Sequence, residues 1–347
     1  MKAVVKTASG YDNMELMEVV EPVAIGNLVK IKIAYSGVCG TDLHAFSGVY
    51  SSTKAPVILG HEFSGVVTEI GPQVKTVKVG DRVTSETTYT TCGKCEHCIS
   101  KDYNLCSNRE GLGTQVNGSM AQYTLSREES IHVLPENVSL LSAALTEPLA
   151  CSVHASIEKA NIQRGDLICI FGVGAIGLLL AQVAKSKGAY VILAGLTSDV
   201  DRLEIGKKIG VDRTVDQMKE NINDIVQKIT KGVGLDVVFE CSGAVAALNK
   251  GIEIVKKKGK IIQMGVFPES KMNIATDLIL NKEITYIGSR SQKPSSWVKS
   301  IKLLKDGVVD PEIIVTKIVS IEQWREAFQI SIKGEGVKSV IKCNDEF

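Results

Sequence analysis

The stretch Leu167-Ile168-Cys169-Ile170-Phe171-Gly172-Val173-Gly174-Ala175-Ile176-Gly177 decides the fold of this chain. A short apolar run ends directly in the pattern G-x-G-x-x-G, and a helical pattern from Leu178 to Gly188 follows it. Alone, the glycine pattern is weak and compatible with a plain structural turn, but after a buried strand and before a helix it is typical of dinucleotide binding. The expected cofactor contacts come from the turn and the first helical residues: Gly172, Gly174, Ala175, Ile176 and Gly177.

Each glycine of this turn has a physical role. Gly172 makes the tight turn, Gly174 lets backbone amides reach a pyrophosphate, and Gly177 lets the helix pack closely on the strand. The helix N-terminus then faces the phosphates with its partial positive charge.

Apolar strands continue to alternate with amphipathic helices downstream of this turn, and this predicts a doubly wound parallel sheet with helices on both faces. The expected strands are 167–171, 190–195, 211–215, 236–240, 260–265 and 284–288. The second strand lacks the acidic residue that binds an adenosine ribose, because it ends at Gly195. Thr197, Ser198 and Arg202 are placed to hold a 2′-phosphate, although Arg202 is equally compatible with the surface. The cofactor is therefore NAD or NADP.

The first 150 residues have a different pattern, with short alternating strands interrupted by glycine and proline. Residues 29–34 and 63–70 alternate in this way, and residues 79–83 carry a turn into another strand. This pattern predicts an antiparallel, barrel-like, mostly β domain.

Four cysteines, Cys92, Cys95, Cys98 and Cys106, cluster within this domain. In a chain without an export signal such clustering indicates a metal site rather than disulfides, with a redox cluster as the alternative. Four thiolates close the tetrahedral shell of a structural zinc ion, so no position stays open for chemistry. His97 lies inside the loop as a competing donor.

A second set of metal donors is spread over the same domain. Cys39 lies in Gly37-Val38-Cys39-Gly40-Thr41-Asp42-Leu43-His44, and His61 and Glu62 follow an apolar run. Catalytic zinc accepts sulfur, nitrogen and oxygen ligands and keeps a position open. Glu147, in an otherwise apolar stretch, is a further expected ligand, because a buried carboxylate needs a cation or a donor. The alternative for Cys39 is a small buried apolar residue.

Length and charge limit the other possibilities. At 347 residues two domains are expected, and a net charge of +1 without a basic cluster argues against nucleic acid or a membrane surface as a partner. The N-terminus resembles a first strand and lacks a secretory segment, so a cytoplasmic location is expected.

The chain as a whole resembles the zinc-dependent medium-chain dehydrogenases, through the two cysteine-containing sites, Glu147-Pro148 and the glycine turn. The donor set Cys39, His61 and Glu62 with Glu147 is similar to the polyol dehydrogenase branch, including enzymes that act on phosphorylated pentitols. Four further stretches resemble the members of this branch that act on phosphorylated pentitols: Asn108–Gln115, Arg127–His132, Glu147–Cys151 and Ile287–Gln292.

This resemblance implies that a secondary alcohol of a polyol or polyol phosphate, with D-arabitol phosphate as the expected substrate, is oxidised to the ketose by hydride transfer. It also implies a GroES-like catalytic domain over 1–152 and 291–347 and a Rossmann domain over 153–290, with a cleft between them. A homodimer or homotetramer is expected, with the strand 284–288 extending the sheet across a two-fold axis.

The resemblance and the spacing together suggest roles for individual residues. Thr41 is expected to hydrogen-bond the alcohol oxygen, His44 to pass the proton to solvent, or to be an ordinary surface residue, and Asp42 to orient His61. If the substrate carries a phosphate, the expected cationic partners are Arg290, then Arg109 and Lys293, each equally compatible with the solvated surface.

Three alternatives stay open at this point. An unphosphorylated polyol or an amino alcohol such as L-threonine is the competing substrate. Manganese competes with zinc at the Cys39 site, although the thiolate favours zinc. A protein that binds the dinucleotide without turnover is disfavoured by the complete donor set.

Overall fold

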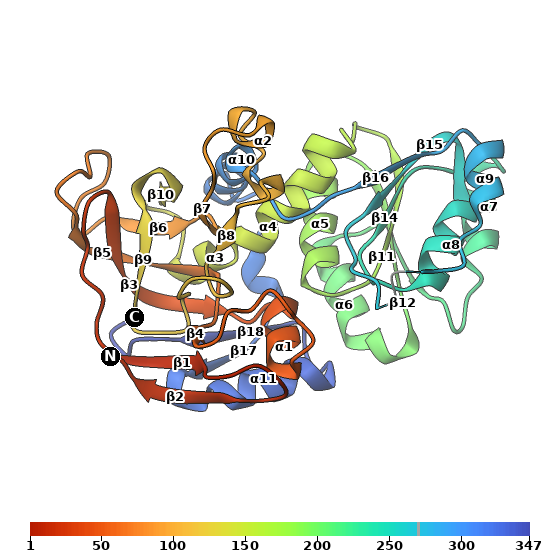
Figure 1. Cartoon of the computed structure of the whole chain (residues 1–347). Coiled ribbons are helices and arrows are strands. Elements are labelled where there is room, and N and C mark those ends of the chain that lie inside the picture. The colour runs from red at the N-terminus through yellow and green to blue at the C-terminus, as the bar shows by residue number, and fades with distance from the viewer. Residues whose placement is uncertain (269–270) are drawn as a thin grey trace. The chain divides into compact units, whose positions relative to one another are not determined.

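The computed structural model describes residues 1–268 and 271–347 and divides into two compact units (Figure 1). The first comprises Met1–Ala150, Gln292–Gly307 and Pro311–Phe347, and the second comprises Cys151–Ser291 and Val308–Asp310. Across the described residues, no helix combines the length and apolar character needed to span a membrane.

The described residues of the second unit form a six-stranded parallel sheet in the order β13-β12-β11-β14-β15-β16. Its strands are β11 (Leu167–Phe171), β12 (Tyr190–Gly195), β13 (Arg213–Asp216), β14 (Leu235–Glu240), β15 (Val255–Gln263) and β16 (Thr285–Gly288). Its α-helices are α5 (Ala175–Ser186), α6 (Val200–Ile209), α7 (Ile222–Thr230), α8 (Val245–Ile254) and α9 (Thr276–Asn281).

The helices of this unit cover both faces of the sheet. Figure 1 shows α5 and α6 on one side and α7, α8 and α9 on the other. Apolar side chains of the strands, including Cys169, Phe171 and Val238, are buried beneath α8. The predicted doubly wound parallel sheet is confirmed.

Helix α5 begins three residues earlier than the sequence pattern indicated. It opens at Ala175 and ends at Ser186, so Gly177 lies inside its first turn. The apolar periodicity shows only from Leu178 onward, which explains the late predicted start. Gly188, at φ +77°, adopts a left-handed conformation that ends the helical pattern.

The first unit is mostly β structure. Its largest sheet has the order β10-β6-β5-β3-β18-β17, with β9 also paired to β3. The strands are β3 (Leu28–Gly37), β5 (Glu62–Ile70), β6 (Arg82–Ser85), β9 (Tyr123–Arg127), β10 (Ile131–Val133), β17 (Val315–Ser320) and β18 (Lys338–Lys342). One small sheet has the order β2-β1-β4, formed by β2 (Met14–Glu18), β1 (Lys2–Lys6) and β4 (Val57–Ile58). Another pairs β7 (Thr88–Thr90) with β8 (Glu110–Gly111). The barrel-like β architecture is confirmed.

Helices complete this unit at its edges. They are α1 (Gly40–Ser47), α2 (Glu96–Ile99), α3 (Leu140–Ala144), α4 (Thr146–Val153), α10 (Pro294–Lys305) and α11 (Trp324–Lys333). Single 3₁₀ turns of this unit cover Tyr103–Leu105, Glu128–Ser130, Pro311–Ile314 and Ile321–Gln323. The second unit adds a π-helix, His154–Lys159, and the 3₁₀ turn Thr197–Asp199. Residues after 291 therefore add β18 to β3, at the strand that carries the first metal site.

Candidate metal centres and cofactor turn

The ends of two paired strands bring the first donor set together. Strands β3 and β5 are antiparallel, with Gly37 opposite Glu62. Cys39 follows β3 as the N-cap of α1, and His61 immediately precedes β5. One ligand atom from each of Cys39, His61 and Glu62 lies within 4.8 Å of the other two. We call these three residues the Cys39 site.

Asp42 fastens the two loops of this site to each other. Its carboxylate, 1% exposed, accepts the backbone N–H of Cys39 at 2.9 Å and that of Gly60 at 3.2 Å. The ring Nδ1 of His61 is 3.8 Å from Asp42 Oδ1, too far for the expected orienting hydrogen bond. The carboxylate thus acts on the backbone that carries the ligands rather than through a hydrogen bond to the His61 ring.

Close backbone packing fixes the turn that carries His61. Gly60 has φ +90°, and a Cβ at Gly113 or Gly118 would lie 2.5 or 2.0 Å from the Gly60 carbonyl oxygen. Such distances exclude any side chain at these two glycines without displacing the turn. The loop 111–118 therefore forms the support on which His61 is positioned.

Lys338, which the sequence analysis missed, reaches the Cys39 site from β18. Its side chain is 4% exposed, forms an ion pair with Glu62 Oε2 and donates to the carbonyl oxygen of Val38 at 2.9 Å. A Cβ at Gly37 would lie 2.3 Å from Glu62 Oε2, so glycine leaves room for this carboxylate. The sequence gives no separate signal, because a lysine in a short strand usually extends to solvent.

The electrostatics of the site favour an additional cation. Burial alone would lower the pKa of His61, but the charges of Asp42, Cys39 and Glu147 together raise it well above its ordinary value. Burial likewise opposes the raised pKa of Lys338, which Glu62, Cys39 and Glu147 produce. Both cationic groups are thus held by an excess of negative charge.

The donor chemistry fits zinc. The Nδ1 atom of His61 is buried without a hydrogen-bond partner. Oε2 of Glu62 makes its ion pair with Lys338 but no hydrogen bond of acceptable geometry. One sulfur, one nitrogen and one carboxylate oxygen are a ligand set that zinc accepts while keeping a position open. These residues would hold the ion.

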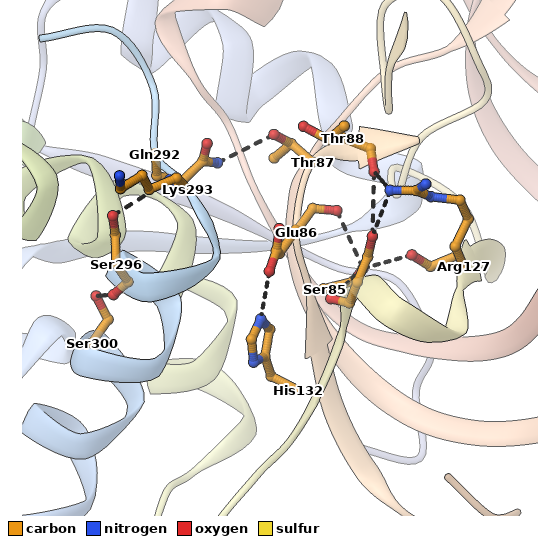
Figure 2. A network of polar contacts seen from close by, with 12 residues as sticks. Ser85, Glu86, Thr87, Thr88, Arg127, His132, Gln292, Lys293, Ser296 and Ser300 are labelled. Carbon is orange, nitrogen blue, oxygen red and sulfur yellow. Dashed lines mark hydrogen bonds and ion pairs between the residues drawn. The ribbon is translucent and has the colours of Figure 1, made fainter. Parts of the chain in front are cut away.

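Glu147 does not belong to this group of three in the part of the chain that the structure describes. Its Oε1 accepts a hydrogen bond from Gln292 Nε2 at 2.9 Å, and this buried amide also donates to Thr87 Oγ1 at 3.2 Å (Figure 2). In this structure the carboxylate accepts from an amide, and its expected role as a fourth ligand stays a prediction. Its charge still acts on His61 and Lys338.

Arg109 joins the same polar cluster. Its guanidinium donates to the hydroxyls of Thr87 and Thr88, each at 2.9 Å. We call Thr87, Arg109, Glu147 and Gln292 the Thr87 cluster. Thr87 and Gln292 were missed from the sequence, because polar residues of their type are common in loops and only the fold brings 87 and 292 together.

The other two expected phosphate-binding cations lie elsewhere. Lys293 forms an ion pair with Asp102 at 2.9 Å, which ties α10 to the loop of the cysteine cluster. Arg290 is exposed and follows β16, in the second unit. Arg109 thus lies in the same hydrogen-bonded cluster as Glu147. The Lys293 ammonium group is instead paired with the Asp102 carboxylate.

The four-cysteine lobe, Cys92, Cys95, Cys98 and Cys106, forms a compact thiol cluster. Neighbouring sulfur atoms are 3.5, 3.7 and 3.8 Å apart. A tetrahedron with metal–sulfur bonds of about 2.3 Å has edges of about 3.8 Å, so the cluster has the size of a closed zinc site. No disulfide occurs among the nine cysteines.

The thiols of the lobe differ in acidity: the pKa of Cys95 is raised to about 11, whereas that of Cys98 is lowered. Backbone N–H groups of Lys94 and Cys95 lower the pKa of the Cys92 thiol to about 6. His97 is on the half-exposed side of α2, 3.8 Å from Glu96, and is not one of the clustered donors. The predicted zinc lobe is confirmed as part of the fold.

Thr41 and His44 lie in sequence on the first helix after Cys39. Thr41 is half-buried in the first turn of α1, and His44, three residues later, is exposed. Residues three apart are neighbours on one helix face, so the pair leads from beside the thiol toward solvent.

The glycine turn of the second unit has the backbone that a dinucleotide needs. Gly172 has φ +103°, and a Cβ at Gly177 would lie 2.0 Å from the Gly172 carbonyl oxygen. A Cβ at Gly174 would meet nothing within 4 Å, so this residue leaves open space before the N-terminus of α5 at Ala175 and Ile176. The turn therefore fits a pyrophosphate.

The residues after β12 are already partnered. Thr197 donates to Asp216 at 2.7 Å, and Arg202 pairs with Asp199 at 3.3 Å. Ser198 is exposed on the 3₁₀ turn between them. The carboxylates of Asp216 and Asp199 thus contact two of the groups expected to hold a 2′-phosphate, Thr197 and Arg202. The cofactor is NAD or NADP.

Comparison with known proteins agrees with both units. Residues 26–136 match the alcohol dehydrogenase GroES-like domain, and residues 175–306 match the zinc-binding dehydrogenase domain.

Two curated relatives extend over nearly the whole chain. D-arabitol-phosphate dehydrogenase of Enterococcus avium is 49% identical over 346 residues, 100% of this chain and 98% of the relative. Sorbitol dehydrogenase of Halalkalibacterium halodurans is 48% identical over 341 residues, 98% and 99% of the two chains. A solved structure from Sinorhizobium meliloti with NADP bound has a TM-score of 0.90 at 28% identity, covering 98% of each chain.

Proposed function

The chain belongs to the zinc-binding dehydrogenase family, and from this membership we propose that it is a polyol dehydrogenase whose preferred substrate is a polyol phosphate. It is an enzyme with a nicotinamide cofactor, NAD or NADP. The proposed reaction oxidises a secondary alcohol, with D-arabitol phosphate as the first substrate to test.

The observation that carries this proposal is the convergence of Cys39, His61 and Glu62 from two separate loops. A protein that binds a dinucleotide without turnover has no need to preserve three different donors at one point. A zinc ion bound there would supply the Lewis acidity that eases loss of the alcohol proton.

The chain's own residues would handle that proton. In the proposed relay Thr41 Oγ1 accepts the alcohol proton as its own hydroxyl proton moves on toward His44, and the exposed His44 imidazole takes up that proton and releases one to water. The supporting geometry is their position on one face of α1. Asp42 keeps the helix start and the His61 turn at a fixed separation while this occurs.

The relay gives an expectation for kcat. Thr41→Ala should lower kcat by about a hundredfold, in line with the loss of positioned proton transfer. His44→Gln should lower kcat less. Steady-state kinetics across pH measure both, with His97→Gln as the control histidine. Unchanged turnover in both variants would contradict the relay.

The phosphate part of the proposal is supported by the D-arabitol-phosphate relative and by Arg109. Its guanidinium is held by the neutral hydroxyls of Thr87 and Thr88 and has the planar fork that binds two phosphate oxygens. Arg290 is retained as a second phosphate partner, whereas the ion pair with Asp102 removes Lys293 from first consideration.

Two arginine variants test the substrate class. Arg290→Ala and Arg109→Ala should raise KM for D-arabitol phosphate at least about tenfold and leave KM for unphosphorylated D-arabitol within about twofold, because the charge-assisted phosphate bonds are lost. Arg213→Ala, which removes an exposed arginine paired with Glu220, is the matched control. Equal effects on both substrates would indicate a structural or hydroxyl-binding arginine.

One substrate panel separates the alternatives. Initial rates with D-arabitol phosphate, D-arabitol, sorbitol and L-threonine, each with NAD and NADP, compare the phosphate proposal with its two competitors. A higher kcat/KM for sorbitol or L-threonine would replace the phosphate proposal, and the dehydrogenase family membership would be unaffected.

We also propose a homo-oligomer in a reducing compartment such as the cytoplasm. Strand β16 is paired on one side only in the described sheet, and a chain with nine cysteines and a thiol cluster suits a reducing environment. The molar mass in solution, measured by light scattering, distinguishes monomer, dimer and tetramer.

A further inference from the structure

Glu240 is a fully buried carboxylate at the carboxyl end of β14, outside the metal centres. Its side chain is 0% exposed. Oε1 accepts hydrogen bonds from the backbone N–H of Ser242 at 2.8 Å, from the Ser242 hydroxyl and from the N–H of Gly243 at 2.9 Å. Three donors on one oxygen are the environment of a charged carboxylate.

The other oxygen of this carboxylate has no partner. Oε2 is buried without a hydrogen bond, and Glu240 takes part in no ion pair within the residues that the structure describes. The remaining buried carboxylates differ in this respect. Glu62 pairs with Lys338, Glu86 contacts His132 at 3.0 Å (Figure 2), Glu147 accepts from Gln292, and each oxygen of Asp42 accepts a backbone N–H.

The position of Glu240 in the sheet is the second observation. It lies opposite Phe171, the last residue of β11, and the following residue, Cys241, donates its N–H to the Phe171 carbonyl at 2.8 Å. A Cβ at Gly172 would lie 3.0 Å from the Cys241 carbonyl carbon and the Ser242 nitrogen, so the loop held by Glu240 lies directly against the glycine turn.

This place in a doubly wound sheet is where a dinucleotide binds. Strands β12 and β13 lie on one side of β11, and β14, β15 and β16 lie on the other. The topological switch point between β11 and β14 receives the cofactor across the carboxyl ends of the strands. With the adenosine on the β12 side, the nicotinamide half lies on the side of β14 and Glu240.

We propose that the Glu240 carboxylate strengthens binding of the oxidised cofactor relative to binding of the reduced one. The oxidised nicotinamide ring carries a positive charge and the reduced ring carries none, so a buried negative charge discriminates between them. A charge in this position is costly without a cation nearby, and the oxidised ring supplies one. The proposal requires cofactor binding only and is independent of the alcohol substrate.

The negative charge of Glu240 affects the pKa of two nearby side chains, Cys241 and Tyr286. Burial first, and the Glu240 charge second, raise the pKa of the Cys241 thiol, and the same two causes in the same order raise the pKa of Tyr286. The field of the carboxylate therefore extends beyond its own loop.

Two variants separate charge from hydrogen bonding. Glu240→Gln keeps an oxygen for the Ser242 and Gly243 donors and removes the charge. Glu240→Asp keeps the charge and shortens the reach to the loop. Asp236→Asn is the matched control. Asp236 is a carboxylate near the start of β14, whereas Glu240 is at its end, and it is paired with Lys256.

Calorimetric titrations with NAD⁺, NADH and ADP-ribose measure the effect, with NADP⁺ and NADPH as a parallel series. Glu240→Gln should raise Kd for NAD⁺ by about tenfold, as expected for unit charges on the order of 10 Å apart at a protein-like dielectric, and change Kd for NADH less than twofold. ADP-ribose, which lacks the ring, should bind with unchanged affinity. Glu240→Asp should preserve the ratio of the NAD⁺ and NADH constants, and Asp236→Asn should too.

An equal change in the NAD⁺ and NADH constants of Glu240→Gln, or no change in either, would reduce Glu240 to a loop support and overturn the proposal. If Glu240→Gln fails to fold by circular dichroism, the Glu240→Asp titration decides, because an altered ratio with the charge retained contradicts it. A protein that binds none of the three ligands would instead contradict the cofactor assignment.

Discussion

Cys39→Ala is expected to lose one of two bound zinc ions and to lower polyol turnover by at least about a thousandfold, because the open metal site loses its thiolate. Without Cys39 only two donors, His61 and Glu62, remain, and Glu62 is already paired with Lys338. Two donors do not make a complete zinc site. Metal content per chain by mass spectrometry, with nicotinamide reduction measured on the same preparation, checks both parts.

The fold of this variant should be unaffected. Cys39 is only partly buried and caps the start of α1, where Asp42 still accepts the backbone N–H of residue 39. A Cys39→Ala protein that retains two ions, or that loses one ion without losing turnover, would remove the Cys39 site from the reaction.

The reciprocal variant is Cys98→Ala in the four-cysteine lobe. It is expected to lose the other ion and to lower the midpoint of thermal unfolding by at least about 5 °C, because a closed thiolate site contributes directly to folding. Cys98→Ala should also change KM, because Asp102 in this lobe pairs with Lys293 at the start of α10. The ion of the Cys39 site should be affected less. Differential scanning calorimetry measures the midpoint.

Cys343→Ala is the control for this pair, because Cys343 is a buried thiol outside both metal sites. It should keep both ions. If Cys98→Ala keeps two ions and an unchanged unfolding midpoint, the lobe is not a structural metal site.

The parts of the molecule that follow from short-range patterns could be predicted from sequence. The strand Leu167–Phe171 and the strand Tyr190–Gly195 occur where the apolar runs indicated. The spacing of the four cysteines likewise encodes a compact lobe, because a few intervening residues limit how far the thiols can separate.

Contacts between distant segments could not be predicted in this way. Lys338 reaches Glu62 only because β18 pairs with β3, and Gln292 reaches Glu147 only because the chain after residue 291 returns to the first unit. Neither residue type signals such a role locally. Their positions depend on strand pairing that no local pattern specifies.

Asp42 and Glu147 show why the partners of a buried carboxylate are hard to predict. The sequence showed that Asp42 and Glu147 are carboxylates near the donor set, and it did not show which hydrogen-bond donors would reach them first. Backbone amides occupy Asp42, and the Gln292 amide binds Glu147. A buried carboxylate takes the donors that the fold supplies, and a metal is only one of them.

The central claim is that turnover depends on an ion held by Cys39, His61 and Glu62. The most direct test is a chelator titration of the zinc-loaded enzyme in which zinc release and polyol-dependent nicotinamide reduction are recorded together. We expect activity to fall in step with the first ion released per chain, because the open three-residue site yields its metal before the closed thiolate lobe. Activity that continues after the first ion has left would contradict the claim.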